Sequence, residues 1–367
     1  MILFVCSSVF QLYVAIIIKK VFLRDKVVDL ILTDSSSVFE CLCKNEELNS
    51  LFNSVKWVSV SKNLSKLNRL QRSKYGQCFY EIFPKKYAKK IWGVNLKKYN
   101  ECYFSSYTRP NILLQYAIKK SCKKNKVHVF EDGISTYLLQ NMQKSSVPKL
   151  LKKFFKVREI ESIVDDVYVF EPNLLCVNCY KKIIEIPKPT LVEGVLDLFN
   201  HVFKGVDYKI NEKFIFLEES FNNDGYVTND SDFIYRLWEC CRKTDFILKH
   251  HPRNRLDRFK TKLPTVENAI FWEHYLLLNS LNNKVLVSVS SNTVFVPHII
   301  SDKQKPTVIL LYKLFNGTSP ILGSGNFENY VKKYCNHYSA YTKEKFYIPE
   351  TMQEFEELIK VLKVKEN

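Results

Sequence analysis

Residues 1–20 read MILFVCSSVFQLYVAIIIKK, and this stretch predicts how the fold begins. An apolar run, Ile2–Cys6, is followed by a short polar turn and then by a longer apolar segment. Ser7, Ser8 and Gln11 interrupt the apolar pattern, which makes the stretch a poor membrane span. It also lacks the basic start and the small-residue cleavage site of a signal peptide. We therefore expect a buried strand, a turn and a helix, as at the start of a parallel α/β sheet.

The same alternation of short apolar runs and longer helical patterns continues through the first half of the chain. Continuous apolar runs separated by helices, such as Asn111–Lys120, are typical of parallel strands with both faces covered. The expected strands are Ile2–Cys6, Val27–Thr33, Val55–Val60, Glu101–Phe104, Val127–Phe130 and Val167–Phe170.

A second α/β series follows two prolines, Pro187 and Pro189, where we expect a domain boundary. Its expected strands and helices, in chain order, are Phe214–Leu217, Phe233–Arg242 (helix), Asp245–Lys249, Tyr275–Leu281 (helix), Lys284–Val289, Thr293–Ile300 (helix), Thr307–Leu311 and a last helix over 350–362. The predicted domains are residues 1–188 and 189–367. Two Rossmann-like domains facing a central cleft form the GT-B plan, although other two-domain α/β enzymes share this pattern.

The composition is that of a globular protein with an excess of positive charge. The 367 residues carry a formal net charge of +17, which implies an anionic partner or simply lysine-rich solvated surfaces. Eleven cysteines without a regular framework indicate a reducing cytosol. The pair Cys176 and Cys179 has the C-x-x-C spacing but lacks a second pair, so no metal site is expected.

Three polar stretches follow apolar runs, at the strand ends where α/β sheets bind ligands. Glu131-Asp132-Gly133 follows the first, and it is either a general base with a tight turn or an ordinary helix start. Lys249-His250-His251-Pro252-Arg253 follows the second, and it is either an anion site or a cationic surface turn. Ser290-Ser291-Asn292 follows the third; its hydroxyls suit a phosphate, a helix cap, or both. An acid in one domain and a phosphate clamp in the other would suit an activated sugar with few phosphates.

In this order, the motifs resemble those of bacterial sialyltransferases that use CMP-sialic acid. The resemblance is to the lipooligosaccharide sialyltransferases (glycosyltransferase family 52) and the related capsular polysialyltransferases. These share an acidic [D/E]-[D/E]-G motif, an HP motif and a paired-serine motif, which read here EDG at 131–133, HP at 251–252 and SS at 290–291. The opening CSSVFQL and the stretch FLEESF at 216–221 also look like this group.

The resemblance implies an inverting, metal-independent sialyltransferase of the GT-B type. Glu131 would be the catalytic base that deprotonates the acceptor hydroxyl, and His251 would assist the departing CMP phosphate. The other implied donor-binding residues are Asp132, Gly133, Lys249, Pro252, Arg253, Ser290, Ser291 and Asn292. CMP carries one phosphate, so neither a metal nor a cofactor is expected. The expected acceptor is a galactose-terminated surface glycan, as in capsule or lipooligosaccharide synthesis.

Besides another CMP-sugar transferase, two other classes of function remain open at this point. A CDP-glycerol-type glycerophosphotransferase also carries an HP stretch and a later serine pair, but EDG and the Val289 that precedes the serines favour sialyl transfer. A basic nucleic-acid or membrane-surface binder would explain the charge, but the basic clusters spread over several elements without a nucleic-acid motif, so no nucleic-acid partner is expected. The stretch PKLLKKFFKVR, residues 148–158, predicts a basic amphipathic helix suited to an anionic membrane. We expect a cytoplasmic enzyme, with peripheral membrane association and a homodimer left open.

Overall fold

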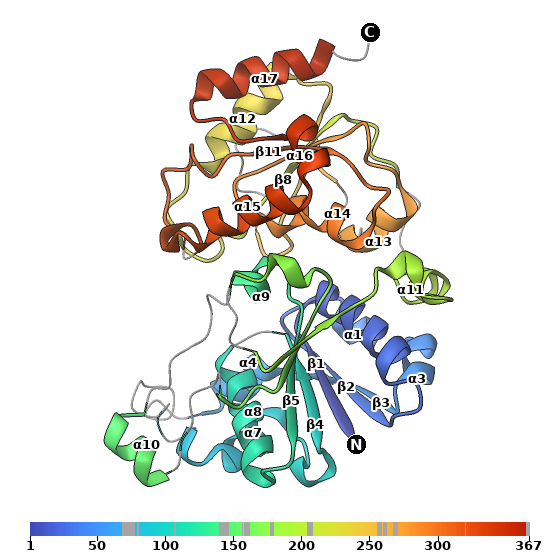
Figure 1. Cartoon of the computed structure of the whole chain (residues 1–367), viewed down its shortest axis with the longest axis vertical. Coiled ribbons are helices and arrows are strands. Elements are labelled where there is room, and N and C mark those ends of the chain that lie inside the picture. Colours follow the sequence, from blue (N-terminus) through green and yellow to red (C-terminus); the bar gives the residue numbers. More distant parts are fainter. Residues whose placement is uncertain are drawn as a thin grey trace. The chain divides into compact units, whose positions relative to one another are not determined.

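The chain folds into two compact units, Met1–Val202 and Phe203–Asn367. Each has its own parallel β-sheet with helices around it (Figure 1, blue to green and yellow to red). The α/β class with two Rossmann-like domains, predicted from the sequence, is confirmed. The computed structural model describes residues 1–67, 78, 81–105, 108–138, 147–155, 157, 162–176, 180–203, 208–254, 259, 263–266, 271–319 and 321–364.

The first unit holds a seven-stranded parallel sheet in the order β3-β2-β1-β4-β5-β6-β7. The strands are β1 (Ile2–Cys6), β2 (Val28–Thr33), β3 (Ser54–Val58), β4 (Glu101–Phe104), β5 (Lys126–Phe130), β6 (Asp166–Val169) and β7 (Lys182–Glu185). The order 3-2-1-4-5 is that of a Rossmann sheet. Ligands of such sheets bind beyond the carboxyl ends of the strands where the order reverses, here between β1 and β4.

The opening stretch forms the predicted strand, turn and helix. β1 and β2 are buried along their whole length, as expected for central parallel strands. Helix α1 (Val9–Phe22) begins after Ser8, whose side chain caps the helix by accepting a hydrogen bond from the backbone N–H of Gln11. At the other end, the buried Lys19 donates to three backbone carbonyls between residues 23 and 26. Ser8 therefore caps the start of α1, and Lys19 ties the loop after the helix to its last turn.

Helices cover both faces of this sheet. Right-handed crossovers from β1 to β2 and from β4 to β5 run in opposite directions, which places α1 and α8 on opposite faces, as Figure 1 shows. The other helices are α2 (Phe39–Leu42), α3 (Glu46–Leu51), α4 (Val60–Ser65), α7 (Pro84–Trp92), η1 (Leu96–Lys98), α8 (Arg109–Ser121), α9 (Ile134–Leu138), α10 (Lys149–Phe155), η3 (Pro172–Leu174), η4 (Pro189–Leu191) and α11 (Val195–Val202).

The boundary between the units lies later in the chain than the prolines suggest. Helix α11 follows them but belongs to the first unit. The reason is packing: the buried ring of Phe199 on α11 stacks on Tyr13 of α1, with ring centroids 4.0 Å apart. Pro189 begins a short 3-10 helix rather than a new domain.

The second unit holds a five-stranded sheet in the order β12-β11-β10-β8-β9. Its elements are β8 (Phe214–Leu217), α12 (Asp230–Cys240), β9 (Phe246–Lys249), α13 (Trp272–Leu278), β10 (Val285–Ser288), η5 (Asn292–Val294), α14 (Val296–Ile300), β11 (Thr307–Leu310), η6 (Leu322–Ser324), α15 (Asn326–His337), α16 (Ser339–Lys345), β12 (Phe346–Tyr347) and α17 (Met352–Val364). Chain order along this sheet is 2-1-3-4-5, which reverses between β8 and β10 and predicts a ligand site there.

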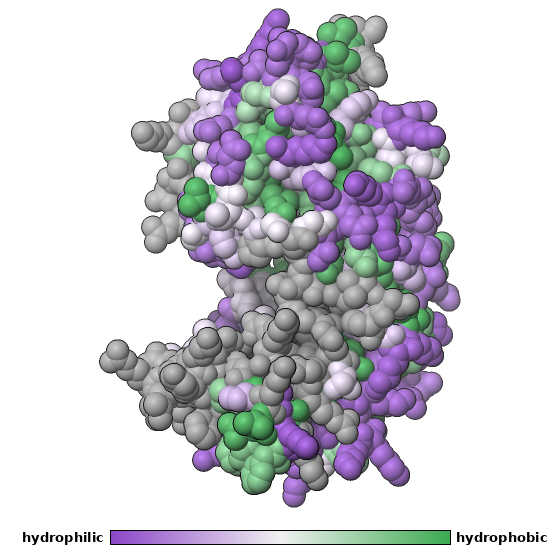
Figure 2. All heavy atoms as spheres, turned by 60° about the vertical axis from the view of Figure 1, so that its left-hand side comes forward, coloured by the Kyte–Doolittle hydropathy of each residue, from purple (hydrophilic) through white to green (hydrophobic). Residues whose placement is uncertain are grey.

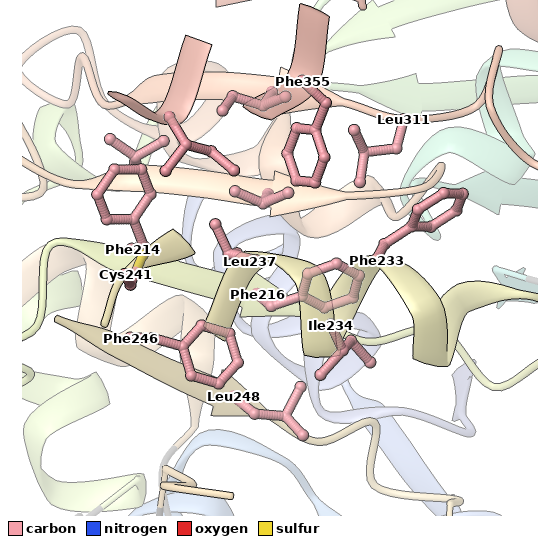
Figure 3. Packing of buried hydrophobic residues seen from close by; sticks show 14 of the residues in the cluster. Phe214, Phe216, Phe233, Ile234, Leu237, Cys241, Phe246, Leu248, Leu311 and Phe355 are labelled. Carbon is pink, nitrogen blue, oxygen red and sulfur yellow. The ribbon is translucent and has the colours of Figure 1, made fainter. Parts of the chain in front are cut away.

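An aromatic core fixes the strands that end at this reversal. Figure 3 shows Phe214 and Phe216 of β8 and Phe246 of β9 among side chains from α12, with Phe355 of α17 nearby. All four residues of β8 are buried. Close packing on both faces leaves little freedom in the position of the polar residues that follow.

Some elements differ from the prediction. Strands β7 and β12 were not expected, because β7 is largely exposed and β12 has two residues. The expected helix over 293–300 is divided into η5 and α14. Among the described residues, no helix has the length and apolar character needed to cross a bilayer.

Candidate active site

The acidic motif begins directly after β5 with a buried side chain. Glu131 is 1% exposed, and its Oε2 accepts hydrogen bonds from the Tyr137 hydroxyl (2.7 Å) and the Phe170 N–H (2.8 Å). Burial raises the pKa of Glu131 to about 8, because desolvation outweighs these hydrogen bonds. At pH 7 the group is therefore largely a neutral acid that joins the loop after β5 to the end of β6.

Asp132 has a different environment. It is half-buried, and its Oδ1 accepts a hydrogen bond from Nε2 of Gln11 (2.8 Å) in the first turn of α1. Its N–H donates to the Thr136 hydroxyl (2.7 Å). Gly133 follows with φ of 68°, a left-handed conformation that favours glycine. Of the two acids, Asp132 is the one that keeps contact with solvent.

In the second unit, two acids follow β8 and contact both neighbouring strand ends. Glu218 is 3% exposed, and its Oε2 accepts hydrogen bonds from Nδ1 of His250 and from the N–H of His251, both at 3.0 Å. His250 is thus buried against a carboxylate, while His251 is only partly buried. The adjacent histidines therefore have different environments, and Glu218 orients the start of the HP motif.

His251 is held as a neutral hydrogen-bond donor. Its Nδ1 accepts a hydrogen bond from the N–H of Arg253 (3.2 Å), so the neutral ring carries its proton on Nε2. Burial, with the positive charges of Arg253 and Lys249, lowers the pKa of His251 to about 4. The imidazole is therefore uncharged at pH 7, with Nε2–H available to an acceptor atom.

The two cations of this stretch differ in how they are held. Lys249 lies 5.7 Å from the ring centroid of Trp272, and burial lowers its pKa against the opposing effect of Glu273 and Glu218. Arg253 donates from Nη1 to Asp224 (3.2 Å) and from Nη2 to the Ser220 hydroxyl (2.8 Å). The guanidinium therefore stiffens the loop after β8, and its expected contact with an anion stays a prediction. Pro252 is exposed.

The serine pair also divides into two roles. Both the N–H and the hydroxyl of Ser290 donate to Oε1 of Glu219, and Ser290 is 3% exposed. Ser291 is partly exposed, and its hydroxyl pairs with that of Thr293 (2.7 Å). The buried Oδ1 of Asn292 has no hydrogen-bond partner among the described residues. Ser291 thus remains able to meet a ligand, while Ser290 is bound to Glu219.

Glu219 is a second buried acid with a raised pKa. Burial raises its pKa to about 8, against the hydrogen bonds from Ser290. Its Oε2 is buried without a hydrogen-bond partner in the described part of the chain. A neutral carboxyl at this position avoids repulsion of an anion bound beside the serines.

Sequence reasoning did not assign roles to Gln11, Tyr137, Glu218 or Glu219. The signal for the last two was present, because FLEES has two acids after a buried run, as EDG has. Among the described residues, no cluster of three or more histidine, cysteine or acidic side chains could hold a metal ion. Cys179 of the C-x-x-C pair lies outside the described residues.

Comparisons with known proteins identify the family. A family model described as alpha-2,8-polysialyltransferase matches residues 2–310, which contain all three motifs. No curated protein sequence matches the chain. Similar solved structures include the alpha/beta-galactoside alpha-2,3-sialyltransferase of Photobacterium phosphoreum (10% identity, TM-score 0.48, 91% of this chain and 96% of that one) and the UDP-GlcNAc 2-epimerase of Methanocaldococcus jannaschii (14%, 0.44, 91% of both).

The family match confirms the predicted resemblance to bacterial sialyltransferases, and with it a glycosyltransferase that uses a nucleotide-sugar donor and a glycan acceptor. The chain belongs to the alpha-2,8-polysialyltransferase family.

Proposed function

We propose that the protein transfers sialic acid from CMP-sialic acid to a hydroxyl of a glycan acceptor, with inversion at the anomeric carbon. The family match over residues 2–310 carries this proposal. In an α2,8 linkage the acceptor hydroxyl belongs to another sialic acid, so an oligosialic acid is the first acceptor to test. The galactose-terminated acceptor expected from the sequence is the second.

In the proposed reaction, Asp132 accepts the proton of the acceptor hydroxyl. The hydroxyl oxygen then forms a bond to the anomeric carbon, while the bond from that carbon to the CMP phosphate breaks and its electron pair leaves with CMP. Support for Asp132 comes from its contact with solvent and from Gln11, which orients the carboxylate at 2.8 Å. The assignment of Glu131 as the base, made from the motif, stays a prediction. Substitution of each acid in turn decides between Glu131 and Asp132.

The second unit supplies groups suited to the departing phosphate. His251 offers a neutral N–H from Nε2, and Lys249 adds an amine donor whose pKa burial lowers against the opposing effect of Glu273 and Glu218. Ser291 and Asn292 offer polar side chains at the end of β10. We infer that Glu219, neutral at pH 7, holds Ser290 and the turn without repelling the anion. Since CMP has a single phosphate, this set needs no metal ion to neutralise a diphosphate.

A direct assay tests the function. We expect the protein to release CMP from CMP-sialic acid in the presence of EDTA and to lengthen an oligosialic acid acceptor, detected by mass spectrometry. The parallel acceptor ends in galactose, and the parallel donor is CDP-glycerol. Turnover of CDP-glycerol alone would support the glycerophosphotransferase, and absence of CMP release from CMP-sialic acid, with acceptor or by hydrolysis, would rule out the proposal.

We further propose peripheral association with an anionic membrane through α10. Leu150 is 86% and Phe154 is 79% exposed, and they lie one turn apart on the same side of the helix. Lys152 and Lys153 lie between them, while Phe155 packs against Phe83 (centroids 6.3 Å apart). Figure 2 brings the left-hand side of Figure 1, where α10 lies, toward the viewer and shows an apolar area (green) in its lower part. Lys156, the last lysine of the predicted amphipathic helix, lies outside the described residues.

A vesicle experiment tests this association. We expect the wild-type protein to co-sediment with vesicles that contain anionic lipid at low salt, and the double variant Leu150→Ser/Phe154→Ser to bind roughly tenfold or more weakly, because two large side chains lose their place in the bilayer interface. Leu191→Ser, at a site 74% exposed on the same unit, is the matched control and should bind like wild type. Equal binding by the double variant would mean that charge alone attracts the surface.

A further inference from the structure

An open cavity of about 770 Å³ lies in the second unit, at the carboxyl end of β11. β11 runs parallel to β10 in a register that pairs Ser288 with Leu310, and the N–H of Leu311 donates to the carbonyl of Ser288 (2.8 Å). Tyr312, which lines the cavity, follows Leu311 directly, and Ser290 comes two residues after Ser288. The cavity and the serine pair thus lie beyond the carboxyl ends of two neighbouring strands.

One wall of the cavity is a loop that is fixed in place. Phe315 stacks on Phe221 with centroids 4.9 Å apart, and the N–H of Thr318 donates to the carbonyl of Val227 (2.9 Å). A Cβ on Gly317 would lie 2.3 Å from both the Phe315 ring and the Val227 carbonyl oxygen, so glycine is required for this close approach. These contacts preform the wall.

The lining combines aromatic rings with hydrogen-bonding groups and a slight excess of negative charge. Tyr312, Phe315 and Phe327 supply ring surface, and the carboxylates are those of Glu328 and Glu350. The cation of the lining, Lys313, is ion-paired with Glu350. The lining therefore holds one more carboxylate than cations, which disfavours a phosphate or a carboxylate.

Aromatic rings beside carboxylates suit one class of ligand. The flat C–H faces of a sugar ring pack on aromatic side chains, and a carboxylate accepts hydrogen bonds from sugar hydroxyls, as in the acidic residue that binds ribose in dinucleotide sites. We propose that this cavity binds an uncharged, hydroxyl-bearing sugar portion of the nucleotide-sugar donor, with Glu328 accepting hydrogen bonds from its hydroxyl groups. This rests on the proposed function, because the adjacent serine pair is taken as part of the donor site.

The test compares Glu328→Gln with Glu344→Gln, which makes the same charge change at an exposed position on α16 outside the cavity lining. Binding of CMP and of CMP-sialic acid is titrated for each protein. We expect Glu328→Gln to bind CMP-sialic acid about tenfold or more weakly, the size of effect typical for a lost hydrogen bond to a charged group. Glu344→Gln should match wild type.

The two ligands distinguish which sugar occupies the cavity. Loss of affinity for CMP-sialic acid alone places the sialic acid side chain there, and an equal loss for CMP places the ribose there; both support the inference. If Glu328→Gln binds both ligands within about twofold of Glu344→Gln, or if only the acceptor KM changes, the inference is overturned. Failure of wild type to bind either ligand would instead contradict the proposed function.

Discussion

Asp132→Asn is expected to lower kcat by about 10²–10⁴-fold, the usual contribution of a general base, while CMP-sialic acid binding survives. Asparagine has the size of aspartate and can still pair with Nε2 of Gln11, which holds the wild-type carboxylate at 2.8 Å. It cannot take a proton from the acceptor hydroxyl. Single-turnover kinetics with saturating acceptor, together with donor titration, would separate the chemical step from binding.

The matched variant is Glu131→Gln, for which we expect activity within about threefold of wild type at pH 7, well below the range for a lost base. Burial raises the pKa of Glu131 to about 8, so the wild-type group is already mostly neutral at pH 7, and glutamine resembles that neutral form. Because the folded pKa lies above the ordinary value, the folded state loses stability as pH rises from about 4.5 through about 8. Glu131→Gln should remove this part of the pH dependence of unfolding.

The two results together decide which acid is the base. If Glu131→Gln loses activity by the larger factor and Asp132→Asn does not, the proton goes to Glu131, as the motif alone suggested. Gln11→Ala adds a further check: it leaves Asp132 without its 2.8 Å partner, so kcat should fall while the KM for the donor changes little. If Gln11→Ala changes the KM for the donor by as large a factor as kcat, Gln11 has a merely structural role.

Most of the sheet could be predicted from the sequence because its strands are buried on both faces. β1 and β8 read as uninterrupted apolar runs, β2 and β10 read as mainly apolar runs, and each was found within one or two residues. β7 reads KIIE and is mostly exposed, so it has no such run. The end of the first unit depends on Phe199 stacking against Tyr13, a contact between distant segments that no local pattern shows.

The motifs could be found from the sequence because they follow buried apolar runs. The sequence did not show which residue of each motif has which role. Which of two adjacent acids, histidines or serines faces a ligand depends on partners brought in by strand order. Glu219 meets Ser290 only because β8 lies beside β10, and Glu218 meets His250 only because β8 also lies beside β9. That order, 2-1-3-4-5, is a property of the whole sheet, so a sequence pattern could give candidates but not their contacts.

His251 carries the second large expected effect. His251→Ala should weaken CMP binding about tenfold or more and lower kcat by about 10²–10⁴-fold, because it removes a hydrogen-bond donor to the phosphate and the imidazolium that forms once the bound phosphate raises the pKa of the ring. The donor is Nε2–H, since Nδ1 accepts from the Arg253 N–H at 3.2 Å. Isothermal titration with CMP and steady-state kinetics would measure the two losses separately.

His251→Gln separates these two roles. Glutamine can donate an N–H to the phosphate but cannot protonate it, so CMP binding should largely recover while kcat stays low. A bound phosphate is expected to raise the pKa of His251 from about 4, since an opposite charge favours the imidazolium. The CMP-bound protein then holds more protons than the free protein, so affinity for CMP should rise as pH falls below 7. In His251→Gln, the part of this pH dependence that is due to His251 should be absent. If both variants bind CMP as tightly as wild type, His251 does not meet the phosphate, and the anion must be bound by Lys249 and the end of β10 alone.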